Sequence, residues 1–93
     1  MIGTFKDRVT EDLWEKGYNR RLGSDLSRVA RRRMAQIQFA TRLEDLRVPP
    51  GNRLEALRGD RTGQFSIRVN DQWRICFVWR EDIAYDVELV DYH

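Results

Sequence analysis

The sequence has too few cysteines and histidines to build a disulfide framework or a metal centre. It contains one cysteine, Cys76, and one histidine, His93, in 93 residues. A lone cysteine excludes paired disulfides, and these two residues do not provide the ligand spacing of a zinc site. We therefore expect neither a metal ion nor another cofactor, and we expect the chain to work in a reducing cytoplasm.

Long hydrophobic runs are also absent. No apolar stretch approaches the roughly 18 residues that a membrane-spanning helix requires. The first residues, MIGTFKDRVTEDLWEKG, contain acidic side chains where a secretory signal has an apolar segment. With 41% hydrophobic and 34% charged residues, the composition is typical of a globular protein. The length suits a single domain, which we expect to cover residues 1–93 and to have no membrane partner.

Two common enzyme signatures are missing as well. Gly59 and Gly63 flank a short turn, but the glycine-rich loop followed by lysine that binds nucleotides does not occur. There is no Gly-x-Ser-x-Gly motif, and a Ser-His-Asp triad would have to use the terminal His93 as its base. These absences argue against a P-loop nucleotidase and against a serine hydrolase.

Lysine is scarce, whereas arginine is abundant and unevenly distributed. Lys6 and Lys16 are the only lysines among 17 basic residues. Residues 20–33 contain six arginines and one acid, whereas residues 81–93 contain five acids and no lysine or arginine. Because arginine forms bidentate contacts with phosphate and carboxylate, the arginine cluster is suited to nucleic acid or to an acidic protein. A solvated helix face is the ordinary alternative.

Helical signals come first along the chain. A short helix is predicted over residues 11–17, capped by Thr10 and ended by Gly17. A longer helix is predicted to begin near Ser24, because apolar residues recur at steps of three and four as far as Leu46. Most arginines of the cluster fall off this apolar stripe, so they face solvent or a partner.

Strand signals follow. Apolar and polar residues alternate over residues 65–69, 73–79 and 85–90, which is the period of a strand. Asn70 and Asp71 predict a compact hairpin, since both residues tolerate a positive φ. Helices first and antiparallel strands after them predict an α+β fold in which two helices cover one face of the sheet. The other face, which we expect to carry polar side chains, is the natural place for a site.

A set of arginines and proton-transferring side chains is predicted to serve that site. Arginine neutralises phosphate and stabilises the charge that develops on it. Carboxylates, tyrosine and histidine transfer protons, and histidine changes charge nearest to neutral pH. The combination matches metal-free RNA cleavage, in which a 2′-hydroxyl attacks its own phosphate. The candidates are Arg53, Glu55, Arg58, Arg61, Arg68, Arg74, Asp91, Tyr92 and His93.

Structural roles compete with these chemical ones. From the alternation alone, Arg74 is predicted to form a cross-strand ion pair with Glu88 or Asp86. Tyr92 could instead pack in the core, as large aromatic residues do. His93 could fray with the chain end.

Strict alternation also separates the terminal residues. It puts Tyr92 on the face of Arg74, and it puts Asp91 and His93 on the opposite face. A β-bulge or a twist at the end of the strand would be needed to bring all three to one site.

Several motifs together resemble a known family. The stretch GNRLEALRGDRTGQFSIRVNDQWRICFVW, at residues 51–79, is followed by the terminal VDYH. This combination is similar to the HigB-like branch of the RelE/ParE toxins, the plasmid-maintenance killer proteins, and the similarity extends from the MIGTFKD start over nearly the whole chain. The resemblance implies a microbial-RNase-like fold of two N-terminal helices on a curved antiparallel sheet. It also implies a cytoplasmic toxin that a cognate antitoxin, of the helix-turn-helix HigA type, holds inactive.

The resemblance also implies an activity and assigns residues to it. The usual activity of this branch is cleavage of messenger RNA at the ribosomal A site, without a cofactor. Asp91, Tyr92 and His93 would belong to the active site, and Arg74 would contact the scissile phosphate. Other arginines would contact the ribosome or RNA, namely Arg20, Arg21, Arg28, Arg31, Arg32, Arg53, Arg61 and Arg68.

The turn before the first long strand departs from the family. Many members have histidine and lysine where this chain has Glu55 and Arg58. Glutamate accepts a proton, so Glu55 or Asp91 is the candidate base and His93 the candidate acid. Arginine, with a pKa above about 12, supplies only charge. The missing histidine and lysine keep two alternatives open: a ParE-like inhibitor of DNA gyrase on the same fold, and a protein that blocks the ribosome without cutting.

Overall fold

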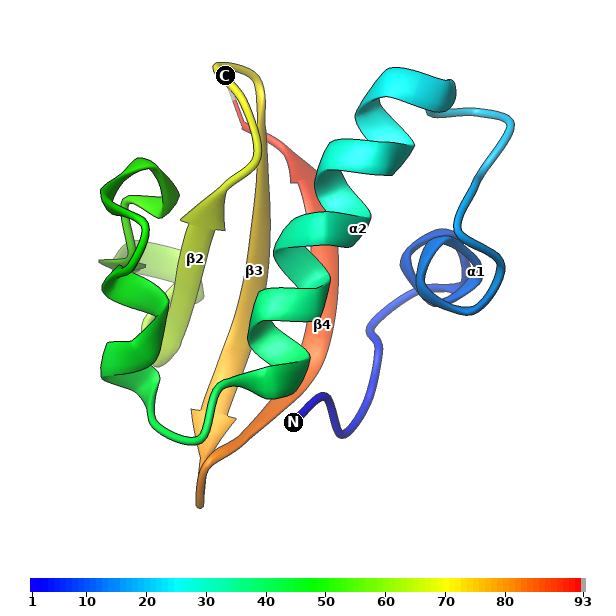
Figure 1. The fold of residues 1–93 in the computed structure, drawn as a ribbon. Helices are drawn as coiled ribbons and strands as arrows, with labels where there is room; N and C mark the ends of the chain where they lie inside the picture. Colours follow the sequence, from blue (N-terminus) through cyan, green and yellow to red (C-terminus); the bar gives the residue numbers. More distant parts are fainter. Residues whose placement is uncertain (93) are drawn as a thin grey trace.

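Two helices form one layer of the molecule and a four-stranded antiparallel sheet forms the other (Figure 1). The computed structural model describes residues 1–92. Helix α1 covers Arg8–Lys16, helix α2 covers Ser24–Phe39, and both pack on the same face of the sheet. The strands lie side by side in chain order and are β1 (Glu55–Ala56), β2 (Gln64–Arg68), β3 (Trp73–Arg80) and β4 (Ile83–Asp91). The predicted α+β fold is confirmed.

Helix α1 begins earlier than the sequence predicts. Its cap is Asp7, whose carboxylate accepts a hydrogen bond of 2.8 Å from the backbone N–H of Thr10. The prediction that Thr10 caps the helix is wrong, because its buried hydroxyl accepts a 3.0 Å bond from the N–H of Leu89 and so ties α1 to β4. Gly17 ends the helix in the left-handed conformation, at φ 78°, as predicted.

Helix α2 begins at Ser24, as predicted, but it ends at Phe39, before the apolar stripe does. The carboxylate of Asp45 accepts hydrogen bonds from the backbone N–H groups of Thr41 and Arg42, at 2.9 and 3.1 Å. These bonds start a separate 3-10 helix, η1 (Leu43–Arg47), in a new direction. Leu46 is still buried there, so the stripe correctly predicts burial but not a continuous helix. No helix within residues 1–92 has the length and apolarity to cross a membrane.

The hydrophobic core lies between the helices and the sheet. Its fully buried members alternate along the strands and recur at helical spacing in α2, which confirms the predicted faces of β2 and β3. They include Leu13, Ala30, Met34, Ile37, Ile67, Ile75, Phe77 and Val87. Burying each large aliphatic or aromatic side chain stabilises the fold by roughly 1.5–3 kcal/mol. This core therefore stabilises the sheet beneath the face that the helices do not cover.

Two hairpins join the last three strands, and their turns are formed by different interactions. Asn70 and Asp71 form the predicted hairpin, but neither has a positive φ. The side-chain oxygen of Asn70 instead accepts hydrogen bonds from the N–H groups of Gln72 and Trp73, at 2.9 and 2.8 Å. Positive φ values occur in the other hairpin, at Glu81 and Asp82, where a two-residue turn matches the twist of the strands.

A β-bulge interrupts β4. Cys76 lies opposite Glu88 and Val78 lies opposite Tyr85, so β4 holds one more residue than β3 over this interval. Asp86, inside the bulge, has a φ of 54°. The bulge moves Tyr85 to the face of Val78, so the predicted unbroken alternation of β4 is wrong at this point. The bulge lies upstream of the chain end and leaves the alternation of the terminal residues unchanged.

Candidate active site

The face of the sheet opposite the helices presents two rows of side chains. Residues directly opposite each other on antiparallel strands point to the same face. One row is Glu55, Ser66, Cys76 and Glu88. The next row is Arg68, Arg74 and Val90. Tyr92 follows Val90 by two residues, so the pleat directs its side chain to this same face.

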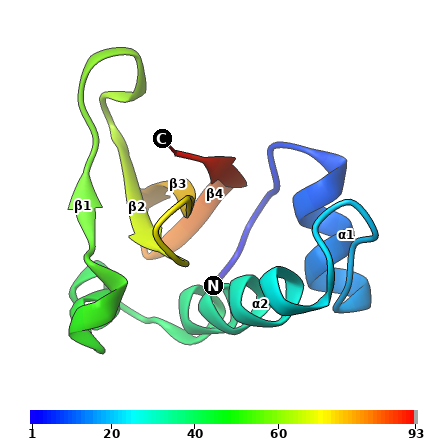
Figure 2. The same ribbon diagram turned by 90° about the horizontal axis from the view of Figure 1, so that it is seen from above.

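The sheet curls around this face and brings β1 towards the end of the chain (Figure 2). A hollow of about 470 Å³ lies there, lined by Glu55, Ala56, Leu57, Arg58 and Tyr92. Glu55 and Arg58 are exposed, and 40% of the surface of Tyr92 is exposed, so a ligand can reach all three. Three of the predicted catalytic residues, from distant parts of the sequence, therefore share one hollow.

Arg74 is held by uncharged groups. Its Nε donates a 2.7 Å hydrogen bond to the hydroxyl of Ser66, and its Nη2 donates a 2.7 Å bond to the backbone carbonyl of Arg53. The predicted ion pair of Arg74 with Glu88 or Asp86 is wrong, because Arg74 forms no salt bridge within residues 1–92. Its positive charge is therefore fixed in place without being neutralised by a carboxylate of this part of the chain.

Arg61 is the arginine that pairs with Glu88. Its Nη1 lies 3.2 Å from the carboxylate of Glu88 and donates a 3.1 Å hydrogen bond to the side chain of Gln64. Cys76, beside Glu88 in the same row, is fully buried. Burial raises the pKa of the Cys76 thiol, although the nearby charge of Arg61 acts in the opposite direction. Cys76 therefore stays a neutral thiol near pH 7 and is a packing residue, not a nucleophile.

The chain end is fastened to the β2–β3 hairpin by Gln72. The side-chain amide of Gln72 donates a 3.0 Å hydrogen bond to the carboxylate of Asp91, and its backbone carbonyl accepts a 2.6 Å bond from the N–H of Tyr92. Asp91 pairs with Trp73 in the sheet register, so it points to the helix side and does not line the hollow with Tyr92. The structure therefore separates Asp91 from Tyr92, as strict alternation predicts. His93, the predicted acid, lies outside the described residues.

Three groups at this site are not predicted from the sequence: the Ser66 hydroxyl, the Arg53 carbonyl and the Gln72 side chain. Alternation does place Ser66 on the correct face, but it gives no sign that Ser66 meets Arg74 across a strand pair. A backbone carbonyl such as that of Arg53 leaves no signal in the sequence at all. Gln72 occupies a hairpin loop, where a polar residue is ordinary.

The arginine cluster of residues 20–33 lies on the helix layer, and most of its side chains are exposed. The side chains of Arg20, Arg28 and Arg32 form no hydrogen bond or ion pair with any residue among 1–92. Arg31 differs, because its Nε donates a 3.0 Å bond to the carbonyl of Trp14 and its guanidinium lies 5.0 Å from the centre of the Trp14 ring. The cluster is thus mainly a source of diffuse positive charge.

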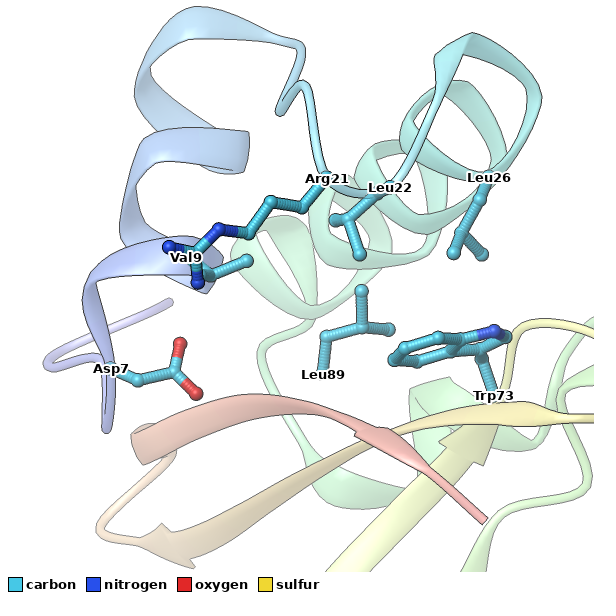
Figure 3. A pocket seen from close by; sticks show the side chains of 7 residues that line it. All are labelled: Asp7, Val9, Arg21, Leu22, Leu26, Trp73 and Leu89. Atoms are coloured by element: carbon cyan, nitrogen blue, oxygen red, sulfur yellow. The ribbon is translucent and has the colours of Figure 1, made fainter. Parts of the chain in front are cut away.

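A second hollow of about 470 Å³ lies between the helices and the sheet (Figure 3). Most of its lining is apolar. The side chain of Arg21 extends towards Asp7, and the Trp73 ring lies at the opposite side of the hollow. The lining residues are Asp7, Val9, Arg21, Leu22, Leu26, Trp73 and Leu89. The one carboxylate of this lining, Asp7, is already engaged in capping helix α1, whereas the hollow on the open face contains Glu55, Arg58 and Tyr92 together. The open face of the sheet is therefore the better candidate for chemistry.

Known proteins match this chain over nearly its full length. The family model described as the RelE-like toxin of type II toxin–antitoxin system HigB matches residues 3–93. Toxin HigB-1 of Vibrio cholerae is 38% identical over 90 residues, which are 96% of this chain and 95% of that protein. Endoribonuclease HigB of Proteus vulgaris is 36% identical over 94 residues and covers both chains completely. An uncharacterized protein of Haemophilus influenzae is 34% identical over 79 residues, 84% of this chain and 78% of its own length.

Two helices on one face of a four-stranded antiparallel sheet are consistent with the fold of a RelE-like toxin. The chain belongs to the HigB-like family of RelE-like toxins of type II toxin–antitoxin systems. Membership in such a system implies an antitoxin partner.

Proposed function

We propose that this toxin is a metal-independent endoribonuclease that cuts messenger RNA in the ribosomal A site and so inhibits translation. The observation that carries the proposal is the state of Arg74, a guanidinium held by Ser66 and the Arg53 carbonyl with no carboxylate partner within residues 1–92. A cation fixed in this way needs little reorganisation to stabilise a developing phosphorane. The name of the Proteus vulgaris relative, Endoribonuclease HigB, supports the same reaction class.

The hollow beside β1 supplies the proton-transfer groups in this proposal. Glu55 takes the proton of the 2′-hydroxyl as that oxygen attacks the adjacent phosphorus. Arg58 and Arg74 neutralise the charge on the phosphorane, and Tyr92 orients the hydroxyl or stacks on a base. His93 gives a proton to the departing 5′-oxygen. The other RNA product then ends in a 2′,3′-cyclic phosphate. The position of Asp91, outside the hollow and bonded to Gln72, favours Glu55 as the base.

The remaining parts of the proposal concern partners and location. The exposed arginines of the α1–α2 loop and α2, together with Arg53, Arg61 and Arg68, contact ribosomal and messenger RNA through phosphate. The antitoxin is a helix-turn-helix protein of the HigA type. The toxin acts in the cytoplasm, and residues 1–93 act as one toxin domain.

Mapping RNA 5′ ends after induction tests the proposal. Discrete cuts within translated reading frames are expected, and these cuts should disappear when translation is blocked before induction. An Arg74→Ala variant expressed at the same level is the control for cuts made by host enzymes. Altered DNA supercoiling with no new RNA ends would instead identify a gyrase inhibitor, and ribosome binding with no new ends would identify a non-cutting blocker of translation.

A further inference from the structure

Ser66 is a buried polar residue on the open face of the sheet. Its exposed fraction is 0%, and its hydroxyl accepts the 2.7 Å hydrogen bond from Nε of Arg74. Its backbone carbonyl also accepts a longer, 3.5 Å bond from Nη2 of the same guanidinium. Burying a hydroxyl is unfavourable unless a hydrogen bond compensates it. The bond to Arg74 provides that compensation, so the two side chains depend on each other.

Arg53 contributes its backbone rather than its side chain. It follows the 3-10 helix η2 (Pro50–Asn52) and adopts the left-handed conformation, with φ 46° and ψ 57°. Residues other than glycine rarely adopt this conformation, and such strained positions cluster at functional sites. Here the backbone carbonyl of Arg53 itself accepts the 2.7 Å hydrogen bond from Nη2 of Arg74.

These contacts fix the guanidinium of Arg74 from one side. Nε and Nη2 are both engaged, whereas Nη1 donates no hydrogen bond within residues 1–92. Because all these acceptors are uncharged, Arg74 keeps its full positive charge for an anion. A carboxylate in place of Ser66 would orient the guanidinium equally well but would cancel that charge. The choice of neutral acceptors is therefore the chemically significant feature.

We infer that the Ser66 hydroxyl and the Arg53 carbonyl position Arg74, so that its Nη1 end meets the scissile phosphate as charge develops there. This inference rests on the proposed endoribonuclease function. Ser66 touches neither substrate nor reacting atoms, so it acts only through Arg74. Its removal should slow the chemical step and leave ribosome affinity unchanged.

Two substitutions of Ser66 and one matched control test the inference. Ser66→Ala removes the acceptor, and Ser66→Cys keeps the shape of the side chain, slightly enlarged, but offers only a weak acceptor. Each should lower single-turnover cleavage on programmed ribosomes about tenfold, the effect of removing one hydrogen bond to a charged group. Ser27→Ala removes another buried hydroxyl, which accepts a 3.3 Å bond from the N–H of Asn19, and should not change the cleavage rate.

A double-mutant cycle separates positioning from general damage. In an Arg74→Ala background, Ser66→Ala should cause no further loss of cleavage rate, because the side chain through which it acts is already missing. An additional tenfold loss in that background would overturn the inference. Weakened ribosome binding at an unchanged cleavage rate would overturn it as well.

A measurement independent of activity examines the hydrogen bond itself. The Nε–H proton of Arg74 should give a slowly exchanging NMR signal, identified by its absence from Arg74→Lys. Ser66→Ala should make exchange of that proton fast. Slow exchange in Ser66→Ala overturns the inference whatever the RNA result is. A wild-type protein that cuts no RNA overturns the proposed function separately, while the exchange rate still decides whether Ser66 holds Arg74.

Discussion

The molecule carries two groups of arginines that differ in how their side chains are held. On the open face of the sheet, Arg61 and Arg74 are each fixed by two side-chain or backbone acceptors. On the helix layer, Arg28 and Arg32 form no side-chain hydrogen bond within residues 1–92. A fixed cation can stabilise charge at one place, whereas several unheld cations raise the potential over a whole surface. Of the fixed group, Arg74, whose acceptors are uncharged, is therefore suited to chemistry, whereas Arg61 is paired with Glu88 and the unheld group is suited to docking.

The largest expected loss of cleavage rate follows from changing Glu55, the proposed base beside the fixed cations. Glu55→Gln should lower single-turnover cleavage by about 10² to 10⁴, the range for one general base. Asp91→Asn should cost much less, because Asp91 points to the helix side and is bonded to Gln72. Both variants should bind ribosomes with wild-type affinity. A larger loss in Asp91→Asn than in Glu55→Gln would move the base to the chain end.

Removal of Arg74, the cation fixed by uncharged groups, should cause the next largest loss of cleavage rate. Arg74→Ala should lower the cleavage rate by about 10² to 10³, as expected for the loss of one stabilising group in the transition state. Arg80→Ala is the matched control, because Arg80 lies at the other end of β3, with its guanidinium 4.6 Å from the centre of the Tyr85 ring. Circular dichroism should show that both variants are folded. Equal activity of the two variants would remove the distinction between fixed and diffuse charge.

Local signals in the sequence were sufficient for much of this architecture. Gly17 marks the end of α1 because glycine readily adopts the left-handed conformation of a helix C-cap. Alternation over β2 and β3 identifies the buried face because the pleat has a period of two. The same alternation places Tyr92 with Arg74 and separates it from Asp91.

Features that depend on interactions between distant residues could not be predicted in this way. Thr10 is a good capping residue, but its hydroxyl bonds to Leu89, which is 79 positions away. The bulge at Asp86 uses a positive φ, which aspartate tolerates, but this tolerance does not indicate which aspartate adopts it. The neighbouring strand β4 carries Glu88 on the same face as Arg74, yet Arg74 binds Ser66 on the other side.

A smaller effect is expected from the unheld arginines of the helix layer. Replacing Arg28 and Arg32 together by glutamine should weaken ribosome binding and make its logarithmic salt dependence shallower by about one unit for each phosphate that is no longer bound. The cleavage rate of the bound complex should not change, because neither side chain lies on the open face of the sheet. Titrations at several salt concentrations measure the slope. An unchanged slope would mean that these two arginines form only a solvated helix face.

The smallest effect concerns Arg31, which belongs to the unheld arginines of the helix layer by sequence but not by structure. Its guanidinium packs on the Trp14 ring and bonds to the Trp14 carbonyl, so it links α2 to α1. An exposed interaction of this kind contributes about 0.5–1 kcal/mol to stability. Arg31→Gln should therefore lower the free energy of unfolding by that amount, whereas Arg32→Gln, one position along the same helix, should leave it unchanged.

Chemical denaturation of both variants, compared with their ribosome binding, decides the role of Arg31. If Arg31 is mainly a link between helices, Arg31→Gln loses stability and flattens the salt slope less than Arg32→Gln does. If it is mainly a docking residue, the two variants lose ribosome affinity equally and remain equally stable. The second result would show that Arg31, although its guanidinium lies over the Trp14 ring, is as available to RNA as Arg32. The division into held and unheld arginines would then not apply to the helix layer.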